Sequence, residues 1–99
     1  MNHKLVESYI KDQLRKDEIM SKYKDYNIFC ENGILYVGTI LEICFQEIIR
    51  VQGYKTGDIL ILDYPEKNGN EEETLFYILL VIRAQIALEA SFDLYKEVI

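Results

Sequence analysis

The sequence predicts a single α+β domain over residues 1–99, in which a four-stranded antiparallel sheet packs against three helices in the order α-ββ-α-ββ-α. Three observations lead to this fold class. Asn32-Gly33 separates two short runs rich in β-branched and aromatic residues, Thr39 and Glu42 stand at capping-box spacing, and residues 59–62 are all apolar. With 49% hydrophobic residues and one proline, the composition is typical of a compact folded chain.

The first predicted helix covers residues 2 to about 23, because apolar residues recur there at helical spacing. In a helical projection, four basic residues gather on the opposite face: Lys4, Lys11, Arg15 and Lys22. Glu7 and Glu18 each precede a lysine by four residues, which is the spacing of salt bridges along a solvated helix. We favour this solvated face, and the alternative is a ridge that contacts the phosphate backbone of a nucleic acid.

The dipeptide Asn32-Gly33 predicts a β-hairpin with strands at residues 26–30 and 34–37. A type I′ turn needs a positive φ at both central residues, and Asn-Gly adopts that conformation with the least strain. The turn therefore also sets the register of the two strands.

A second helix is expected over residues 40–51, beginning at the capping box of Thr39 and Glu42. Its polar residues recur at helical spacing and leave most of the helix apolar: Glu42, Gln46, Glu47 and Arg50. Gly53 follows where such a helix would end. A covered helix of this kind would lie in the protein interior.

The remaining chain is expected to repeat the ββα order. Residues 59–62 predict a strand buried on both faces, and residues 65–73 form a polar loop around Asn68-Gly69. Residues 74–82 have no polar stripe, which favours a strand there and a helix over 83–98. The alternative is one long helix over the whole segment, capped by Asn70, with three glutamates in its first turn.

No residue pattern predicts an enzyme, a metal site or a cofactor site. His3 is the only histidine and lies near the N-terminus, where a base in fixed geometry is rare. The acidic residues around the loop at 65–73 match no calcium-loop spacing. Cys30 and Cys44 lack metal-ligand spacing, so we expect two buried thiols, with a disulfide between them as the alternative.

The net charge of −6 argues against polyanion binding by the whole surface, because the acidic excess lies after residue 26. The longest uninterrupted apolar run, residues 75–82, is too short to span a bilayer. The N-terminal residues lack the apolar core of a signal peptide. We therefore expect an intracellular protein without membrane contact.

The segment from Glu47-Ile48 through Gly53-Tyr54-Lys55-Thr56-Gly57-Asp58 to the strand at 59–62 resembles the core of the AbrB-related transition-state regulators. In that family, a Gly-x-Lys-x-Gly-Asp loop joins two strands of a swapped-hairpin dimer, and the resemblance implies DNA binding. It covers about a dozen residues. The arginines that the family places against DNA are missing here.

The whole chain, which is rich in Ile, Lys, Glu and Tyr and has no tryptophan, resembles the orphan small proteins of crenarchaeal filamentous and rod-shaped viruses, such as those of Acidianus filamentous viruses. The resemblance rests on composition and length alone. It implies a thermostable viral protein without an assigned activity that works inside the infected host cell. Ion-pair networks gain value at high temperature, which suits the many charged residues.

These observations favour a small non-enzymatic interaction protein that acts through a surface and forms a homodimer. Its eight tyrosines suit a contact surface, because they are amphipathic and lose little conformational entropy when ordered. The alternative is a DNA- or RNA-binding regulator that uses Lys4, Lys11, Arg15 and Lys22.

Overall fold

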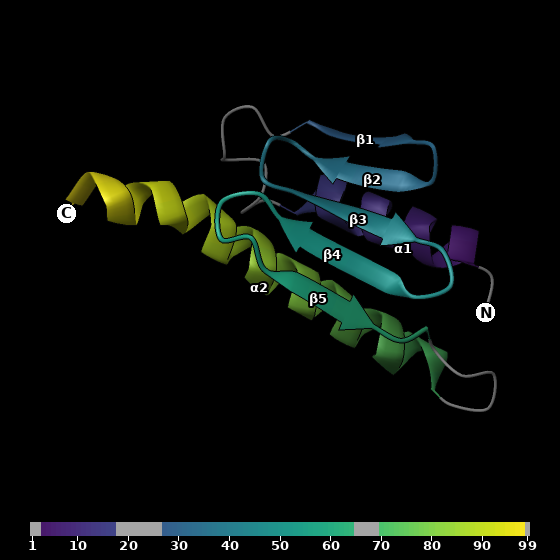
Figure 1. Cartoon of the computed structure of the whole chain (residues 1–99). Coiled ribbons are helices and arrows are strands. Elements are labelled where there is room, and N and C mark those ends of the chain that lie inside the picture. The colour runs from purple at the N-terminus through teal and green to yellow at the C-terminus, as the bar shows by residue number, and fades with distance from the viewer. Residues whose placement is uncertain (1–2, 18–26, 65–69, 99) are drawn as a thin grey trace.

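The computed structural model describes residues 3–17, 27–64 and 70–98, with side chains up to residue 92. Two helices and five strands make up the described fold (Figure 1), and their bounds are α1 (His3–Lys16), β1 (Ile28–Glu31), β2 (Ile34–Val37), β3 (Leu41–Phe45), β4 (Ile49–Gly53), β5 (Ile59–Leu62) and α2 (Glu71–Val98). The strands form one antiparallel sheet in chain order. The α+β class is confirmed, but the predicted four strands and three helices are wrong.

The β1–β2 hairpin forms as its turn residues predict. Asn32 has a φ of 54° and Gly33 a φ of 76°, so both central residues of the turn are left-handed. Glu31 and Ile34 pair on either side of the turn, which places Leu35 beneath the helices.

The predicted helix over residues 40–51 is wrong, because this segment is the β3–β4 hairpin. In β3 the buried residues Leu41, Ile43 and Phe45 alternate with half-buried ones, which is the period of a strand with one face in the core. Residues 46–48 form the connection between the two strands. The helical spacing of the polar residues arises because this connection interrupts the alternation.

The predicted strand at residues 74–82 is also wrong, and the alternative of one long helix is confirmed. Asn70 caps α2, since its Oδ1 accepts a hydrogen bond of 3.3 Å from the backbone N–H of Glu73. The glutamates at 71–73 lie in the first turn, where their charge is favourable with the helix dipole.

Two further predictions differ from the structure in part. The first helix begins at His3 but ends at Lys16, and most of its predicted continuation lies outside the described residues. The strand at 59–62 forms as β5, but it is an edge strand: Ile59 and Ile61 are exposed, while Leu60 and Leu62 are half-buried. The loop with Asn68-Gly69 lies outside the described residues.

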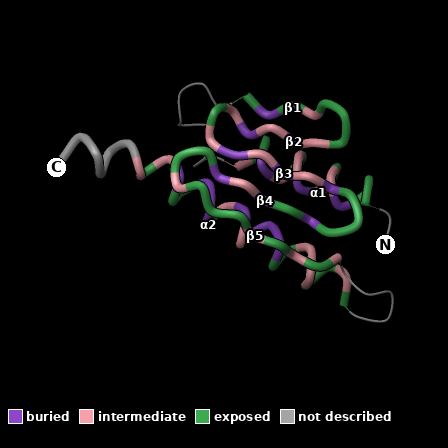
Figure 2. The backbone as a smooth tube through the Cα atoms, viewed as in Figure 1, coloured by how far each residue is buried: buried purple, intermediate pink, exposed green. Residues whose placement is uncertain are grey.

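Both helices lie on the same face of the sheet (Figure 1), with α1 against β1 and β3, α2 against β4, and the two helices in contact. The hydrophobic core fills the space between these two layers (Figure 2) and contains Val6, Ile10 and Leu14 of α1, Ile78, Ile82 and Ile86 of α2, and the inward residues of β1 to β4. No described helix or strand covers the opposite face of the sheet, the open face.

Candidate functional site

The position of α2 on the sheet is fixed by a buried carboxylate. The Glu89 side chain is 1% exposed and lies against the β4–β5 connection. Its Oε2 accepts hydrogen bonds from the backbone N–H groups of Lys55, at 2.8 Å, and Thr56, at 3.2 Å. Its Oε1 accepts from the Thr56 hydroxyl and from Gln85 Nε2, the latter at 3.2 Å. We call this set of contacts the Glu89 anchor.

The Glu89 anchor holds a charged group inside the protein. Burial on its own would raise the pKa of Glu89, but the hydrogen bonds from Thr56, Lys55 and Gln85 outweigh burial and lower the pKa below its ordinary value. Gly53 makes room for this carboxylate, because a Cβ at position 53 would collide with Glu89 Oε1. The glycine predicted as a helix stop is therefore a packing requirement within β4.

With α2 held in this way, one side of the helix points away from the sheet. This exposed face of α2 contains Phe76, Tyr77, Leu80, Ala84, Ala87, Leu88 and Ser91. The four large side chains among them are between 43% and 61% exposed. The two charged residues between 74 and 92 are Arg83, which pairs with Asp17 just after α1, and the buried Glu89. No charged side chain therefore lies within this face from Phe76 to Ser91, and Arg83 borders it with its guanidinium paired to Asp17.

By length and composition alone, α2 also resembles a helix that spans a membrane. The stretch Glu71–Phe92 is long and apolar enough to cross a bilayer, and a third of its most apolar window is buried within the fold. A core helix of a globular protein can have the same length and composition, so these properties are only weak evidence that α2 enters a membrane. The apolar stretch is longer than the uninterrupted run at 75–82 because only Arg83 and Glu89 interrupt it up to residue 92, and the expectation of no membrane contact stays a prediction.

The open face of the sheet is more mixed in character. Phe29 stacks on Tyr36 with 5.0 Å between ring centroids, and the Tyr54 hydroxyl donates a 3.0 Å hydrogen bond to Glu42. Burial and this hydrogen bond raise the pKa of Tyr54 to about 12. The register places charged or polar residues among the apolar ones in adjacent strands, as with Arg50 of β4 beside Ile61 of β5. This surface has the alternation of an ordinary solvated sheet face.

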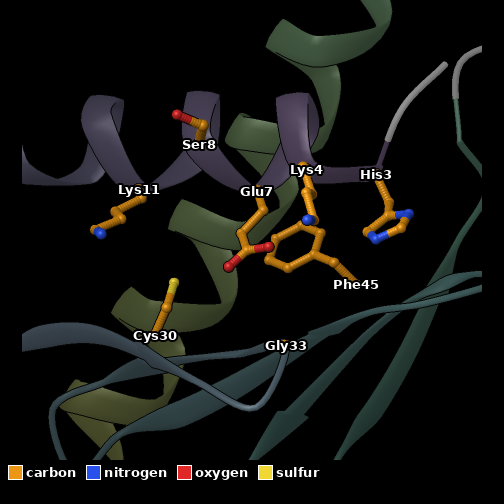
Figure 3. Close-up of a pocket in the computed structure, with 8 residues that line it drawn as sticks. All are labelled: His3, Lys4, Glu7, Ser8, Lys11, Cys30, Gly33 and Phe45. Atoms are coloured by element: carbon orange, nitrogen blue, oxygen red, sulfur yellow. The ribbon is translucent and has the colours of Figure 1, made fainter.

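A cleft of about 420 Å³, the α1 cleft, separates α1 from the β1–β2 hairpin (Figure 3) and is lined by His3, Lys4, Glu7, Ser8, Lys11, Cys30, Gly33 and Phe45. Two of the predicted basic ridge residues, Lys4 and Lys11, lie here. The Arg15 guanidinium instead donates a 3.1 Å hydrogen bond to the carbonyl of Ile28. Lys22 lies outside the described residues, so the structure brings only part of the predicted ridge together.

The Cys30 thiol in the α1 cleft is not activated as a nucleophile. Burial, with smaller contributions from Glu7, raises the pKa of the Cys30 thiol to about 11, so that the thiol is protonated and a poor nucleophile. Cys30 and Cys44 are both free and half-buried. By register Cys30 shares the inward face with Leu35, whereas Cys44 shares the open face with Ile34, so the alternative of a disulfide between them is not realised. Among the described residues, no group of three His, Cys, Asp or Glu side chains could hold a metal ion.

Comparison with known proteins gives no relative: no protein-family model matches the chain, and no curated protein or solved structure matches it. The viral origin, the intracellular location and the thermostability implied by composition stay predictions. The DNA binding implied by the likeness to the AbrB-related regulators also stays a prediction. In this structure the backbone amides of that loop bind Glu89 of the same chain.

Sequence reasoning missed both the Glu89 anchor and the exposed face of α2. The anchor joins Glu89 to Lys55 and Thr56, which lie 34 and 33 positions earlier in the chain, and no local sequence pattern signals such a contact. The exposed face did have a signal, because Tyr77, Leu80, Ala84, Ala87 and Ser91 recur at alternating spacings of three and four. The absence of a polar stripe at 74–82 concealed this helical pattern.

Proposed function

We propose that this chain is a small non-enzymatic interaction protein that works by self-association through the exposed face of α2. The observation that carries the proposal is the lack of any charged side chain on that face over the residues from Phe76 to Ser91. A helix on the surface of a folded domain ordinarily carries a polar stripe toward water. Because the outer side of α2 lacks such a stripe, we expect that side to be covered in the working state of the protein.

Physical comparison of the available surfaces supports α2 over the sheet. The exposed aromatic and leucine side chains of α2 adjoin small residues and form one continuous apolar stripe. On the open face of the sheet, Glu31, Glu42 and Arg50 interrupt the apolar side chains, which lowers the gain from covering it. Charged residues are depleted at the centres of protein interfaces, and α2 fits that composition better.

The test compares one lysine substitution on each surface. Leu80→Lys places a charge in the exposed face of α2, and Ile61→Lys places one on the open face of the sheet, where the side chain is also exposed. At about 100 μM, where even a small interface is populated, light scattering should give the wild type twice its 11.7 kDa chain mass. Leu80→Lys should have the mass of one chain, and Ile61→Lys should keep the wild-type mass.

The opposite pattern of masses would place the interface on the sheet, and a wild type that stays at 11.7 kDa would overturn self-association. A bilayer is the rival cover for α2. Flotation with phosphatidylcholine vesicles distinguishes a bilayer from a second copy of the chain. We expect the wild type to stay out of the vesicle fraction. Recovery with the vesicles, lost in Leu80→Lys, would replace a protein partner by a lipid surface.

Nucleic-acid binding by Lys4, Lys11, Arg15 and Lys22 is a second candidate, and the shared position of Lys4 and Lys11 at the α1 cleft favours it. Arg15 counts against it, because its guanidinium is bonded within the fold. The mass measurement with added duplex DNA at low salt tests this candidate. An increase that salt reverses, and that is lost when the four residues become glutamine, would support it over self-association.

A further inference from the structure

We propose that two copies of this chain pair their α2 helices antiparallel across the exposed face, with Ala84 of each copy at the two-fold axis. This rests on the proposed function, and it adds the orientation and the register of the interface. A two-fold interface must be complementary to itself, so that each residue that contacts a partner residue is contacted by it in return. Parallel and antiparallel pairs both meet that condition, and the sizes of the exposed side chains together with the charge of the first turn favour the antiparallel one.

The spacing along the face is that of a helix–helix seam. Residues 77, 80, 84, 87 and 91 alternate in steps of three and four, and they fall within about 80° of one another on a helix with 3.6 residues per turn. Position 81 is half-buried and position 82 belongs to the core, so the seam points away from the sheet. A second helix can therefore approach without any rearrangement of the fold.

The large residues gather at one end of this seam and the small ones in its middle and at the other end. In an antiparallel pair centred on Ala84, Tyr77 faces the small Ser91 of the second copy, and Leu80 faces Leu88. Ala84 faces its own counterpart, where two small residues let the helix axes come within the ~8–10 Å of close packing. Each Tyr77 thus meets a small residue, and a layer of two leucines lies between it and the central alanines on both sides of the axis.

A parallel pair would place each residue beside its own counterpart. Tyr77 would then face Tyr77, while Ala84, Ala87 and Ser91 would face small residues and leave space unfilled. The first turn adds a charge argument, since parallel pairing brings together the two sets of glutamates at 71–73. Antiparallel pairing puts these sets at opposite ends of the pair, about 36 Å apart for residue 72 at a rise of 1.5 Å per residue.

The area of the face indicates a modest affinity. An aromatic side chain buries about 150–250 Å², so Phe76 and Tyr77, at 54% and 61% exposure, offer roughly 100 Å² each. Leu80, Leu88 and the alanines extend the patch to on the order of 400 Å², which is the size of the largest apolar patch on a typical monomer. Two such faces bury about 800 Å² in total, less than the ~1,200 Å² of the smallest stable interfaces, so the dimer would be a weak, transient one with a dissociation constant in the micromolar range.

Cysteine cross-linking tests the register directly. The background is Cys30→Ser with Cys44→Ser, which removes both free thiols of the chain. Tyr77→Cys in that background, mixed with a mass-tagged Ser91→Cys, should form a disulfide between the two different chains under mild oxidation, because their Cα atoms would lie within about 7 Å. Tyr77→Cys alone should yield at least tenfold less dimer. Ala84→Cys alone should cross-link to itself, which confirms that the face is in contact.

Failure of the register is distinguishable from failure of the proposed function. Efficient cross-linking of Tyr77→Cys to itself, without the mixed product, would mean a parallel pair: the antiparallel register would be overturned while self-association through α2 stands. If none of the three cysteine variants cross-links although the wild type has the mass of two chains, the interface lies elsewhere. That outcome would overturn both proposals.

Discussion

The two helices lie on the same face of the sheet, yet they present opposite kinds of surface to solvent. The exposed residues of α1 are mostly polar or charged, with Leu5 as the exception, and its buried residues form one narrow stripe of Val6, Ile10 and Leu14. On α2 a stripe of mostly apolar residues is likewise buried against the core, but the opposite, exposed side of the helix is apolar as well. Only α1 has the amphipathic pattern of a helix whose outer side is meant to face water.

The helices also differ in how they are held in place. The buried side chains of α1 are all apolar, whereas α2 adds the Glu89 anchor, a charged group with hydrogen bonds to the β4–β5 connection. A polar anchor specifies position along the helix more sharply than apolar contacts, because its hydrogen bonds form in one register only. The difference would favour the proposed contact through the outer face of α2, because the anchor gives that face a fixed orientation.

The largest expected effect breaks the anchor of α2. Glu89→Ala removes the acceptor of the part-buried N–H groups of Lys55 and Thr56, and it should lower the free energy of unfolding by about 2–4 kcal/mol, because a hydrogen bond to a charged group is worth about 1.5–3 kcal/mol. Asp12→Ala on the exposed side of α1 is the matched control and should stay within about 0.5 kcal/mol of the wild type. Urea unfolding of the three proteins measures both values. A loss below 1 kcal/mol for Glu89→Ala would mean that apolar packing alone positions α2.

The same anchor gives a smaller, pH-dependent effect. Because the folded pKa of Glu89 lies below its unfolded value, about 4.3 for glutamate, the stabilisation is fully present above that pH and is lost as pH falls through the folded pKa. Glu89→Gln removes the titration but keeps the size of the side chain. The difference in unfolding free energy between wild type and Glu89→Gln should therefore be constant from pH 5 to 7 and shrink at lower pH. A difference that does not change with pH would contradict the charged anchor.

The comparison of regions also explains which parts of the fold could be predicted from sequence. The β1–β2 hairpin was predictable because its turn depends on two adjacent residues, Asn32 and Gly33, whose φ values are local properties. The β3–β4 hairpin was not, because the short connection at 46–48 shifts the alternation and imitates a helical period. Both patterns are compatible with the same apolar residues, and only pairing with β2 and β5 decides between them.

For α2, the lack of a polar stripe at 74–82 made the prediction from sequence wrong, and it also underlies the proposed interaction face. A segment without a polar stripe reads as a strand buried on both faces, or as a helix that the fold and a partner cover together. Sequence alone does not contain the partner, so the simpler strand was favoured at 74–82. The cap at Asn70 and the seam spacing from Tyr77 onward were the signals that would have corrected it. The Glu89 anchor had no comparable signal, since it depends on how α2 packs against the connection between β4 and β5.

The smallest expected effect concerns the contact that joins the two helices. Arg83 Nε of α2 lies 2.7 Å from Asp17 Oδ2, next to the end of α1, and both side chains are at least partly covered. In a double-mutant cycle with Arg83→Gln and Asp17→Asn, the coupling energy should be about 1 kcal/mol, because partial exposure screens the pair. The coupling should weaken as salt is raised from 0.1 M to 1 M. A coupling near zero would mean that the helices adopt their relative positions through apolar contacts and the Glu89 anchor alone.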